Sequence, residues 1–364
     1  MLNGAQMLLA DGASASFGTE LKTAVAAFIV GIVVGMTGMG GGALMTPALI
    51  FLGVGDAATV VTADLTAAAV YKSAGATVHW RKGKPNFHLA KWLILGSVPM
   101  ALLGPHLVRW MNSGQDSDSL DTTLKLWIGF ALLLAATSYA LRLYIELRRR
   151  AKGTIVTNDD PVVKPVLTIL VGAVGGLLVG ITSVGSGSVI MIALLMLYPG
   201  LSALKLVGTD LVQAVPLVFA AAISNIALNG LDWSILIPLI IGSVPGSILG
   251  SHIAPRVPQS YIRRGIVAVL TMSGLALLDK AGWAPLGSGD DDTHPLFIAI
   301  VGLVVLAAVP LVWGVLRKQL GMPMFGAPTV AEIESREVTA DVAPGAPGAP
   351  GAPAAPPPAP VDLA

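Results

Sequence analysis

Charged residues are scarce in this sequence, and cysteine is absent. Of 364 residues, 12% are Asp, Glu, Lys or Arg and 54% are hydrophobic, with a mean hydropathy of +0.77. Because soluble domains carry about a quarter charged residues, this composition excludes an ordinary soluble domain and indicates an integral membrane protein. The lack of cysteine excludes disulfides, thiolate metal sites and cysteine nucleophiles.

Other signals are missing as well. Residues 1–20 have no basic region and too short an apolar core for a secretory signal peptide. The sequence contains no metal-ligand cluster and no basic surface for nucleic acid, so we expect neither a metal nor a cofactor. The expected partners are the lipid bilayer and a small solute.

Long apolar segments dominate what is present. A membrane-spanning helix needs about 20 apolar residues. Four segments are shorter and form two pairs, 21–35 with 43–53 and 165–180 with 188–198, and each pair flanks a glycine-rich break. We expect each pair to be a broken helix or a hairpin that reaches mid-membrane. The segments near or above the required length are 57–79, 90–110, 123–146, 203–228, 233–253, 263–279 and 296–316.

A segment near residue 100 recurs in the second half of the chain. GSVPMALLGPH (96–106) and GSVPGSILGSH (242–252) are identical at seven of eleven positions, at an offset of 146. The same offset aligns Asp64 with Asp210. Recurrence at a fixed offset is the signature of a duplicated architecture.

The glycine-rich breaks also align, at an offset of 145: GMTGMGGGAL (35–44) matches GITSVGSGSV (180–189). The tail, which contains APGAPGAPGAPAAPPPAP, cannot bury a core, and we expect it to be disordered. The predicted organisation is an N-terminal segment (1–20), a first membrane repeat (21–147), a basic linker (148–164), a second membrane repeat (165–280), a loop with an extra C-terminal span (281–318) and the tail (319–364).

Basic residues in short loops predict the orientation, because cytoplasmic loops carry an excess of Lys and Arg. The loop 80–85 is basic and cytoplasmic, whereas its counterpart 229–232 has no basic residue and falls outside. These loop positions fit one continuous chain only if each glycine-broken pair returns to the side of the membrane from which it entered. We therefore expect an all-α polytopic protein of the cell inner membrane with a cytoplasmic C-terminus. It has two inverted repeats, each a glycine-broken helix or hairpin plus three transmembrane helices, and one extra C-terminal helix. Such repeats are typical of secondary transporters.

The glycine-rich breaks are candidate anion sites. A break frees backbone N–H groups, and the helix that begins after it attracts anions at its N-terminus. Close packing is the alternative, and it is favoured for the GxxxG pairs Gly31/Gly35 and Gly176/Gly180. The candidate substrate-binding residues are Thr37, Gly38, Gly40, Gly41, Gly42, Lys72, Thr182, Ser183, Gly185, Ser186, Gly187 and Ser188.

Ionisable residues within the apolar segments are further candidates, because they are costly in a membrane unless they are paired or hydrated. Lys72 follows Asp64 by about 12 Å along a helix, too far for direct pairing. Lys72 could attract the anion. Asp64, Asp210 and the neighbouring Thr209 could carry a coupling proton or cap a helix, and both alternatives stay open.

Two enzyme signatures are weaker. Gly38, Gly40 and Ala43 imitate a dinucleotide fingerprint, but no strand precedes them. Ser186 or Ser188 with His252 could form an intramembrane serine protease pair, although nothing in the sequence brings them together.

GMTGMGGGALMTP, VGITSVGSGSVIM, LSALKLVGTDLVQAVP and the paired GSVP segments resemble the TauE/SafE family, also called the toluene-sulfonate uptake permease family. The resemblance covers about residues 20–280 and leaves out the segment 296–316 and the tail. It implies an inner-membrane carrier of two related halves that moves sulfite, sulfonates or related sulfur-containing anions. The likeness extends to residues 37–42 and 182–188 and to Asp64, Lys72, Thr209 and Asp210.

The leading expectation is a secondary carrier that exports sulfite or an organosulfonate by alternating access. Proton-coupled uptake of a sulfonate or related anion is the alternative within transport, with protons as an additional partner. A membrane protease and a scaffold that recruits partners through its tail are the alternatives from other classes.

Overall fold

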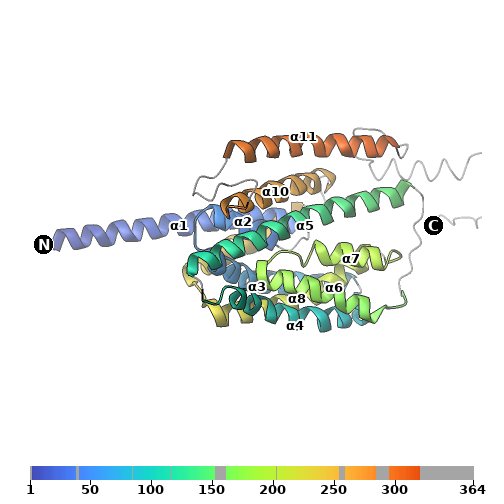
Figure 1. The fold of residues 1–364 in the computed structure, drawn as a ribbon, viewed down its shortest axis with the longest axis horizontal. Coiled ribbons are helices and arrows are strands. Elements are labelled where there is room, and N and C mark those ends of the chain that lie inside the picture. The colour runs from blue at the N-terminus through green and yellow to red at the C-terminus, as the bar shows by residue number, and fades with distance from the viewer. Residues whose placement is uncertain are drawn as a thin grey trace, which may run out of the picture. The chain divides into compact units, whose positions relative to one another are not determined.

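Every regular element in the described part of the chain is an α-helix (Figure 1). The computed structural model describes residues 2–37, 41–83, 85–114, 116–151, 161–201, 203–253, 259–283 and 295–319. In chain order the helices are α1 (Leu2–Thr37), α2 (Gly42–Phe51), α3 (Ala57–Gly83), α4 (Phe87–Met111), α5 (Ser117–Ala151), α6 (Pro165–Thr182), α7 (Val189–Leu197), α8 (Ala203–Asn229), α9 (Trp233–Ile253), α10 (Gln259–Lys280) and α11 (Pro295–Gln319).

Six described stretches are long and apolar enough to cross a membrane, and they lie in α1, α4, α5, α6, α8 and α9. Two of them, Gly18–Thr37 and Pro165–Thr182, correct the expectation that the apolar segments 21–35 and 165–180 are too short to span. By contrast α2 and α7 have 10 and 9 residues, about 15 Å of helix, and cannot cross a bilayer alone.

Threonine explains why α1 and α6 extend past their apolar runs. Thr37 Oγ1 donates to Val33 O at 2.8 Å, and Thr182 Oγ1 donates to Leu178 O at 2.6 Å. Each hydroxyl is satisfied by a carbonyl one turn earlier in its own helix. A helix can therefore run to a threonine in an apolar environment without an unpaired polar group.

The α6–α7 pair is a hairpin. The Tyr198 hydroxyl, directly after α7, accepts from the Lys164 N–H at 2.9 Å and lies 2.6 Å from Thr168 Oγ1. Lys164 and Thr168 flank the start of α6. The end of α7 therefore lies beside the start of α6. Gly96 of the neighbouring helix α4 packs on Ile169 of α6, so α4 begins at this same end of the bundle.

The α1–α2 pair reverses in the same way, at the other end of the bundle. Glu20 of α1 and Trp233 of α9 line one pocket. Ile235 of α9 packs against Gly55 in the turn that follows α2. Both ends of this hairpin thus lie where α9 and α3 begin, and α3 then runs to the end where α4 and α6 start.

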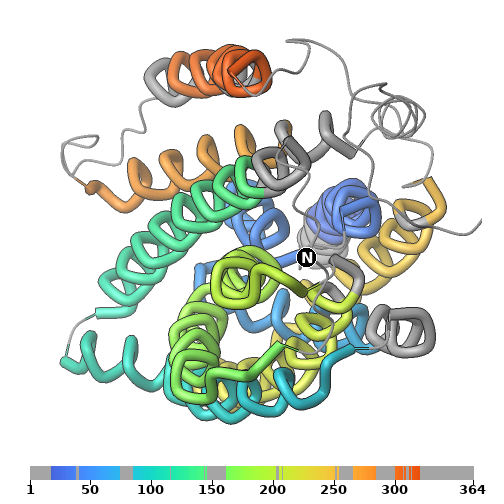
Figure 2. The backbone as a smooth tube through the Cα atoms, turned by 90° about the vertical axis from the view of Figure 1, so that its right-hand side faces the viewer, coloured from blue at the N-terminus to red at the C-terminus, as the bar shows by residue number. Residues whose placement is uncertain are grey.

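Glycines allow two helix pairs to pack with their backbones in contact. A Cβ at Gly35 of α1 would overlap the Ser247 carbonyl of α9, and a Cβ at Gly176 of α6 would overlap the Ser97 carbonyl of α4. The packing role predicted for both GxxxG pairs is therefore confirmed. Each contact joins a helix of one repeat to a helix of the other, and α1 lies beside α9, and α4 beside α6, in Figure 2.

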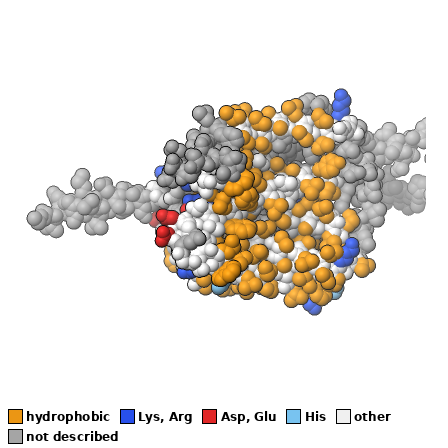
Figure 3. Space-filling view, in the orientation of Figure 1, with side chains coloured by type: hydrophobic (Ala, Val, Ile, Leu, Met, Phe, Trp, Pro, Cys, Tyr) orange, Lys and Arg blue, Asp and Glu red, His pale blue; other side chains and the backbone are white. Residues whose placement is uncertain are grey.

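The outer surface is apolar. Large side chains such as Trp110 and Leu303 are more than 70% exposed. In Figure 3 hydrophobic side chains cover the flank of the bundle, and the described charged side chains gather toward its ends. Such a surface suits lipid rather than water.

The C-terminal part adds one helix to the bundle, since α11 packs against α10 (Figure 2). The compact unit that contains all described residues ends at Met324. The predicted tail (319–364) and much of the predicted linker (148–164) lie outside the described residues, so their predicted organisation stays a prediction.

Candidate functional site

The site forms where the turns of the two hairpins touch. Gly42 begins α2, and a Cβ there would overlap the backbone oxygen of Ser183, the residue that follows α6. Only glycine fits at this contact without a shift of either backbone. The two glycine-rich breaks, 145 residues apart in the alignment of the repeats, are thus neighbours in space.

The second break has an unusual backbone. Ser183 has φ of 60°, the one positive φ at a non-glycine residue in the described chain, and Gly185 has φ of 123°. A left-handed serine is uncommon and persists only when its surroundings hold it. Here the Ser183 N–H donates to Val179 O at 2.9 Å, and its side chain is held by Asp64.

Asp64 of α3 joins the two hairpins. Its Oδ2 accepts from Thr46 Oγ1 of α2 at 2.6 Å and from Ser183 Oγ at 2.9 Å. The side chain is fully buried, and Oδ1 makes no hydrogen bond to any described residue. A buried carboxylate oxygen without a donor is costly, so it is a place where a proton or a polar group would be stabilised.

Lys72, two turns further along α3, contacts the same break. Its Nζ donates to Ser186 Oγ at 2.6 Å, and the side chain is 7% exposed. The ammonium also interacts electrostatically with Asp210 and Asp64. Among the described residues Ser186 is its hydrogen-bond partner, which leaves two of the three N–H donors of the ammonium for another acceptor.

The first break is less open than predicted. The Gly41 N–H was expected to be a free anion donor, but it donates to the Tyr71 hydroxyl at 2.9 Å. Tyr71 fills the space beside Gly41, where a Cβ would overlap its oxygen. Gly38 and Gly40, also predicted to bind substrate, lie outside the described residues.

The hydroxyls beside the breaks divide into two groups. Thr37 and Thr182 bond carbonyls of their own helices, and Thr182 Oγ1 also accepts from the Val184 N–H at 3.1 Å. Ser188 directly precedes α7 and is buried, without a side-chain capping bond to that helix. Ser183 and Ser186 are therefore the two that reach the ionisable side chains of α3. Gly187 is buried in the same turn.

Thr209 and Asp210 of α8 do not join this cluster by hydrogen bonds. Thr209 Oγ1 accepts from the N–H of Asn86, the N-cap residue of α4, at 3.0 Å. This contact fits a structural role for the threonine. Asp210 Oδ1 accepts from Gln213 Nε2 of its own helix at 3.1 Å, and the carboxylate interacts electrostatically with Lys72 and Arg142.

Sequence reasoning missed Thr46, Tyr71 and Gln213. Thr46 could have been found, because α2 and α3 are antiparallel neighbours joined by a short turn, and such a pair brings residue 46 close to residue 64. Tyr71 lies beside Lys72 in the sequence, but its partner depends on how α3 crosses the first break. No periodicity in the sequence contains that information.

The arrangement presents hydrogen-bond donors of the kind from which a small anion accepts. The Lys72 ammonium and the Ser186 hydroxyl are hydrogen-bond donors for an oxyanion, whereas the Ser183 O–H is donated to Asp64. In the described part of the chain no group of three or more His, Asp or Glu side chains lies close enough to hold a metal ion.

Comparisons with known proteins agree with this architecture. A family model described as sulfite exporter TauE/SafE matches residues 23–277. The probable membrane transporter protein YjnA of Bacillus subtilis is 37% identical over 253 residues, which cover 68% of this chain and 96% of that protein. The probable membrane transporter protein YdhB of the same organism is 26% identical over 251 residues, covering 69% and 97%.

No solved structure matches the chain significantly. The family match covers α1 from residue 23 and ends within α10, so α11 lies beyond it. Together with the six helices in the described part of the chain that can cross a membrane, these matches identify a multi-pass membrane protein. The chain belongs to the sulfite exporter TauE/SafE family of membrane transporters.

Proposed function

We propose that the protein exports sulfite or a small organosulfonate across the cell inner membrane by alternating access. The observation that carries this proposal is the buried contact of Lys72 with Ser186, beside the point where the two hairpin turns meet. An ammonium and serine hydroxyls at the tip of a broken helix pair are suited to an oxyanion with several acceptor atoms.

The packing supports inverted repeats as the basis of the movement. The α1–α2 hairpin has both ends at one end of the bundle, and the α6–α7 hairpin has both at the other. With the basic loops in the cytoplasm, the first hairpin would enter from outside, the second from inside, and the C-terminus would be cytoplasmic. An anion at their junction would be reached from one side at a time.

Asp64 gives such a carrier a switchable contact. Its carboxylate holds Thr46 of the first hairpin and Ser183 of the second, so separation of the hairpins must break one of these bonds. Export of an anion from an inside-negative cell gains about 2.3 kcal/mol per charge at 100 mV and needs no coupling ion.

Counterflow in proteoliposomes tests the proposal. Purified protein is reconstituted with unlabelled sulfite inside, and uptake of labelled sulfite is followed with and without a pH gradient and an imposed voltage. We expect exchange without a pH gradient and net flux that follows the voltage. Absence of sulfite movement under every condition would exclude sulfite as the substrate.

Proton-coupled uptake is the second candidate, and the buried Asp64 Oδ1 without a described partner favours it, since that oxygen could carry a proton. The same vesicles test this alternative. Sulfite uptake that requires an inward proton gradient, and that becomes independent of the gradient in Asp64→Asn, would favour proton-coupled uptake over export.

The Ser186–Lys72 contact also invites comparison with Ser–Lys hydrolases. His252, the partner considered for a protease, lies at the end of α9 and bonds the Ile248 carbonyl of its own helix. Ser186→Ala separates the classes: a hydrolase would lose all activity, whereas a carrier should keep part of its transport, because the Lys72 ammonium remains.

A further inference from the structure

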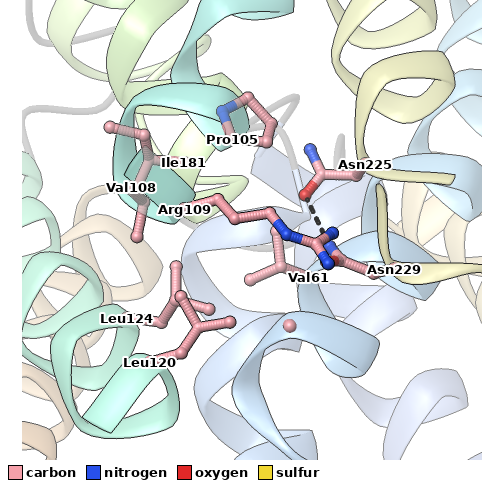
Figure 4. Close-up of a pocket in the computed structure, with 10 residues that line it drawn as sticks. Val61, Pro105, Val108, Arg109, Leu120, Leu124, Ile181, Asn225 and Asn229 are labelled. Carbon is pink, nitrogen blue, oxygen red and sulfur yellow. Dashed lines mark hydrogen bonds between the residues drawn. The ribbon is translucent and has the colours of Figure 1, made fainter. Parts of the chain in front are cut away.

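A pocket lies at the end of the bundle where α3 and α5 begin and α4 and α8 end (Figure 4). About 330 Å³ within it, its mouth included, is free of atoms, but most of that space is too narrow for a water molecule. In this conformation it therefore holds about one water. Under the proposed topology this end faces the outside of the cell.

The walls of this pocket are apolar on one side and polar on the other. Arg109 of α4 faces Asn225 and Asn229 of α8, and Figure 4 shows its side chain extending across the pocket toward them. Arg109 Nη1 donates to Leu228 O at 2.8 Å. Arg109 is the charged side chain among the lining residues.

The two asparagines have different roles. Asn225 is 3% exposed, and its Nδ2 donates at 2.9 Å to both Gly180 O and Ala221 O, which fixes the amide. Asn229 Nδ2 makes two longer bonds, 3.3 Å to Thr62 Oγ1 and 3.4 Å to Asn225 Oδ1. These long bonds are weak, so the Asn229 amide can turn its donors to a ligand at little cost.

The pocket floor adjoins the central site. Val61 and Ile181 line the pocket. Val61 precedes Asp64 by three residues on α3, which puts both on one helix face, and Ile181 precedes Ser183 by two. The bond between Asp64 and Ser183 therefore lies directly behind the floor.

We propose that this pocket is a second anion subsite, in which the Arg109 guanidinium and the Asn229 amide hold a small oxyanion between the central site and the outside. This subsite deepens the proposed function, and its placement toward the outside of the cell rests on the topology proposed there. A guanidinium forms paired hydrogen bonds with a sulfonate-like group, which explains arginine rather than lysine here. The pocket must widen to admit the anion.

The absence of cysteine from the sequence makes a direct test simple. Leu120→Cys adds a thiol to the pocket wall. Whole cells are labelled with a membrane-impermeant maleimide, with and without ethanesulfonate. Ethanesulfonate reacts with neither the thiol nor the maleimide. At ten times its dissociation constant, the anion should slow labelling about tenfold, because the reagent needs an empty pocket. Asp232→Cys, exposed at the same end outside the pocket, should label equally with and without the anion.

Arg109 variants then decide the assignment. Arg109→Gln should abolish the protection, and Arg109→Lys should lose most of it while it keeps the charge. If Arg109→Gln does not reach the membrane, Arg109→Lys with undiminished protection would overturn the guanidinium assignment. No protection in the parent Leu120→Cys protein would also overturn the proposal, since Arg109 would then only cap α8 or bind a lipid phosphate.

This measurement needs binding but no transport. Protection without sulfite counterflow would leave the subsite standing and remove the proposed function. Counterflow without protection would do the opposite.

Discussion

The two repeats surround equivalent aspartates in different ways. Asp64 and Asp210 align at the offset of 146. Asp64 accepts hydrogen bonds from Thr46 and Ser183, which belong to different repeats. Asp210 accepts from Gln213, three residues away on its own helix, and interacts with Lys72 and Arg142 of the other repeat only through their charge. Among the described residues, the Asp64 carboxylate therefore joins the two predicted repeats by hydrogen bonds, and the Asp210 carboxylate does not.

The same asymmetry extends along the helices. The positions equivalent to Tyr71 and Lys72 of α3 are Leu217 and Val218 of α8. In the glycine-rich breaks the polar residue is instead in the second repeat, where Ser186, the partner of Lys72, occupies the position equivalent to Gly41. The ammonium of Lys72 thus comes from one copy, and the serine hydroxyl that it contacts comes from the other.

Removal of the Lys72 ammonium should have the largest effect on transport. Lys72→Ala should lower the rate of sulfite counterflow about 100-fold, about 3 kcal/mol for lost charge-assisted bonds. Val218→Ala, at the equivalent position of α8, is the matched control and should stay within about twofold. Equal rates for Lys72→Ala and the unmodified protein would show that the ammonium does not bind the anion.

Disruption of the close contact between Gly42 and Ser183 should have the second-largest effect. Gly42→Ala sets a Cβ against Ser183 and should cost about 1–3 kcal/mol of stability through overpacking, seen as a lower midpoint of thermal unfolding in detergent. Gly265→Ala in α10 is the control, since no atom lies within 4 Å of its added Cβ. That control should be neutral or stabilised, and a Gly42→Ala protein as stable as it would argue against close contact of the breaks.

The aspartate comparison gives a smaller difference. Asp64→Asn weakens two hydrogen bonds that join the hairpins and should slow counterflow about tenfold, the value of one charge-assisted bond. Asp210→Asn should slow it only about twofold, since its hydrogen-bond partner is on the same helix. Equal losses would mean that both repeats contribute alike to the site.

Deletion of residues 327–364 should have the smallest effect on transport. The family match ends at residue 277, far before this segment. Counterflow by the shortened protein should equal that of the full chain. A clear loss of flux would assign the tail a part in transport, and loss of a co-purifying partner alone would support a recruiting role.

Much of the helical frame follows from the sequence, because it depends on local composition and on glycine spacing. Gly35 and Gly176 were predicted to serve helix contact, and each lies against a backbone carbonyl of the other repeat. The apolar runs located the helices but not their ends, since Thr37 and Thr182 extend α1 and α6 by bonding to their own carbonyls.

The site was only partly accessible to the same reasoning. The position of Asp64 and Lys72 within an apolar segment marked them as exceptional, and the repeat alignment marked Ser183 and Ser186. Their pairing was not predictable, because it depends on how far each break projects past α3, a tertiary property. The occupation of the Gly41 N–H by Tyr71 is of the same kind.

The glycine-lined packing has a consequence for how such a molecule can move. Backbones that touch along a whole interface cannot slide without collision, so α1 with α9, and α4 with α6, should each behave as one rigid body. Each body contains the long arm of one hairpin and a helix from the opposite half. We therefore expect the units that shift during the proposed transport cycle to be two hybrids of the predicted repeats and not the repeats themselves.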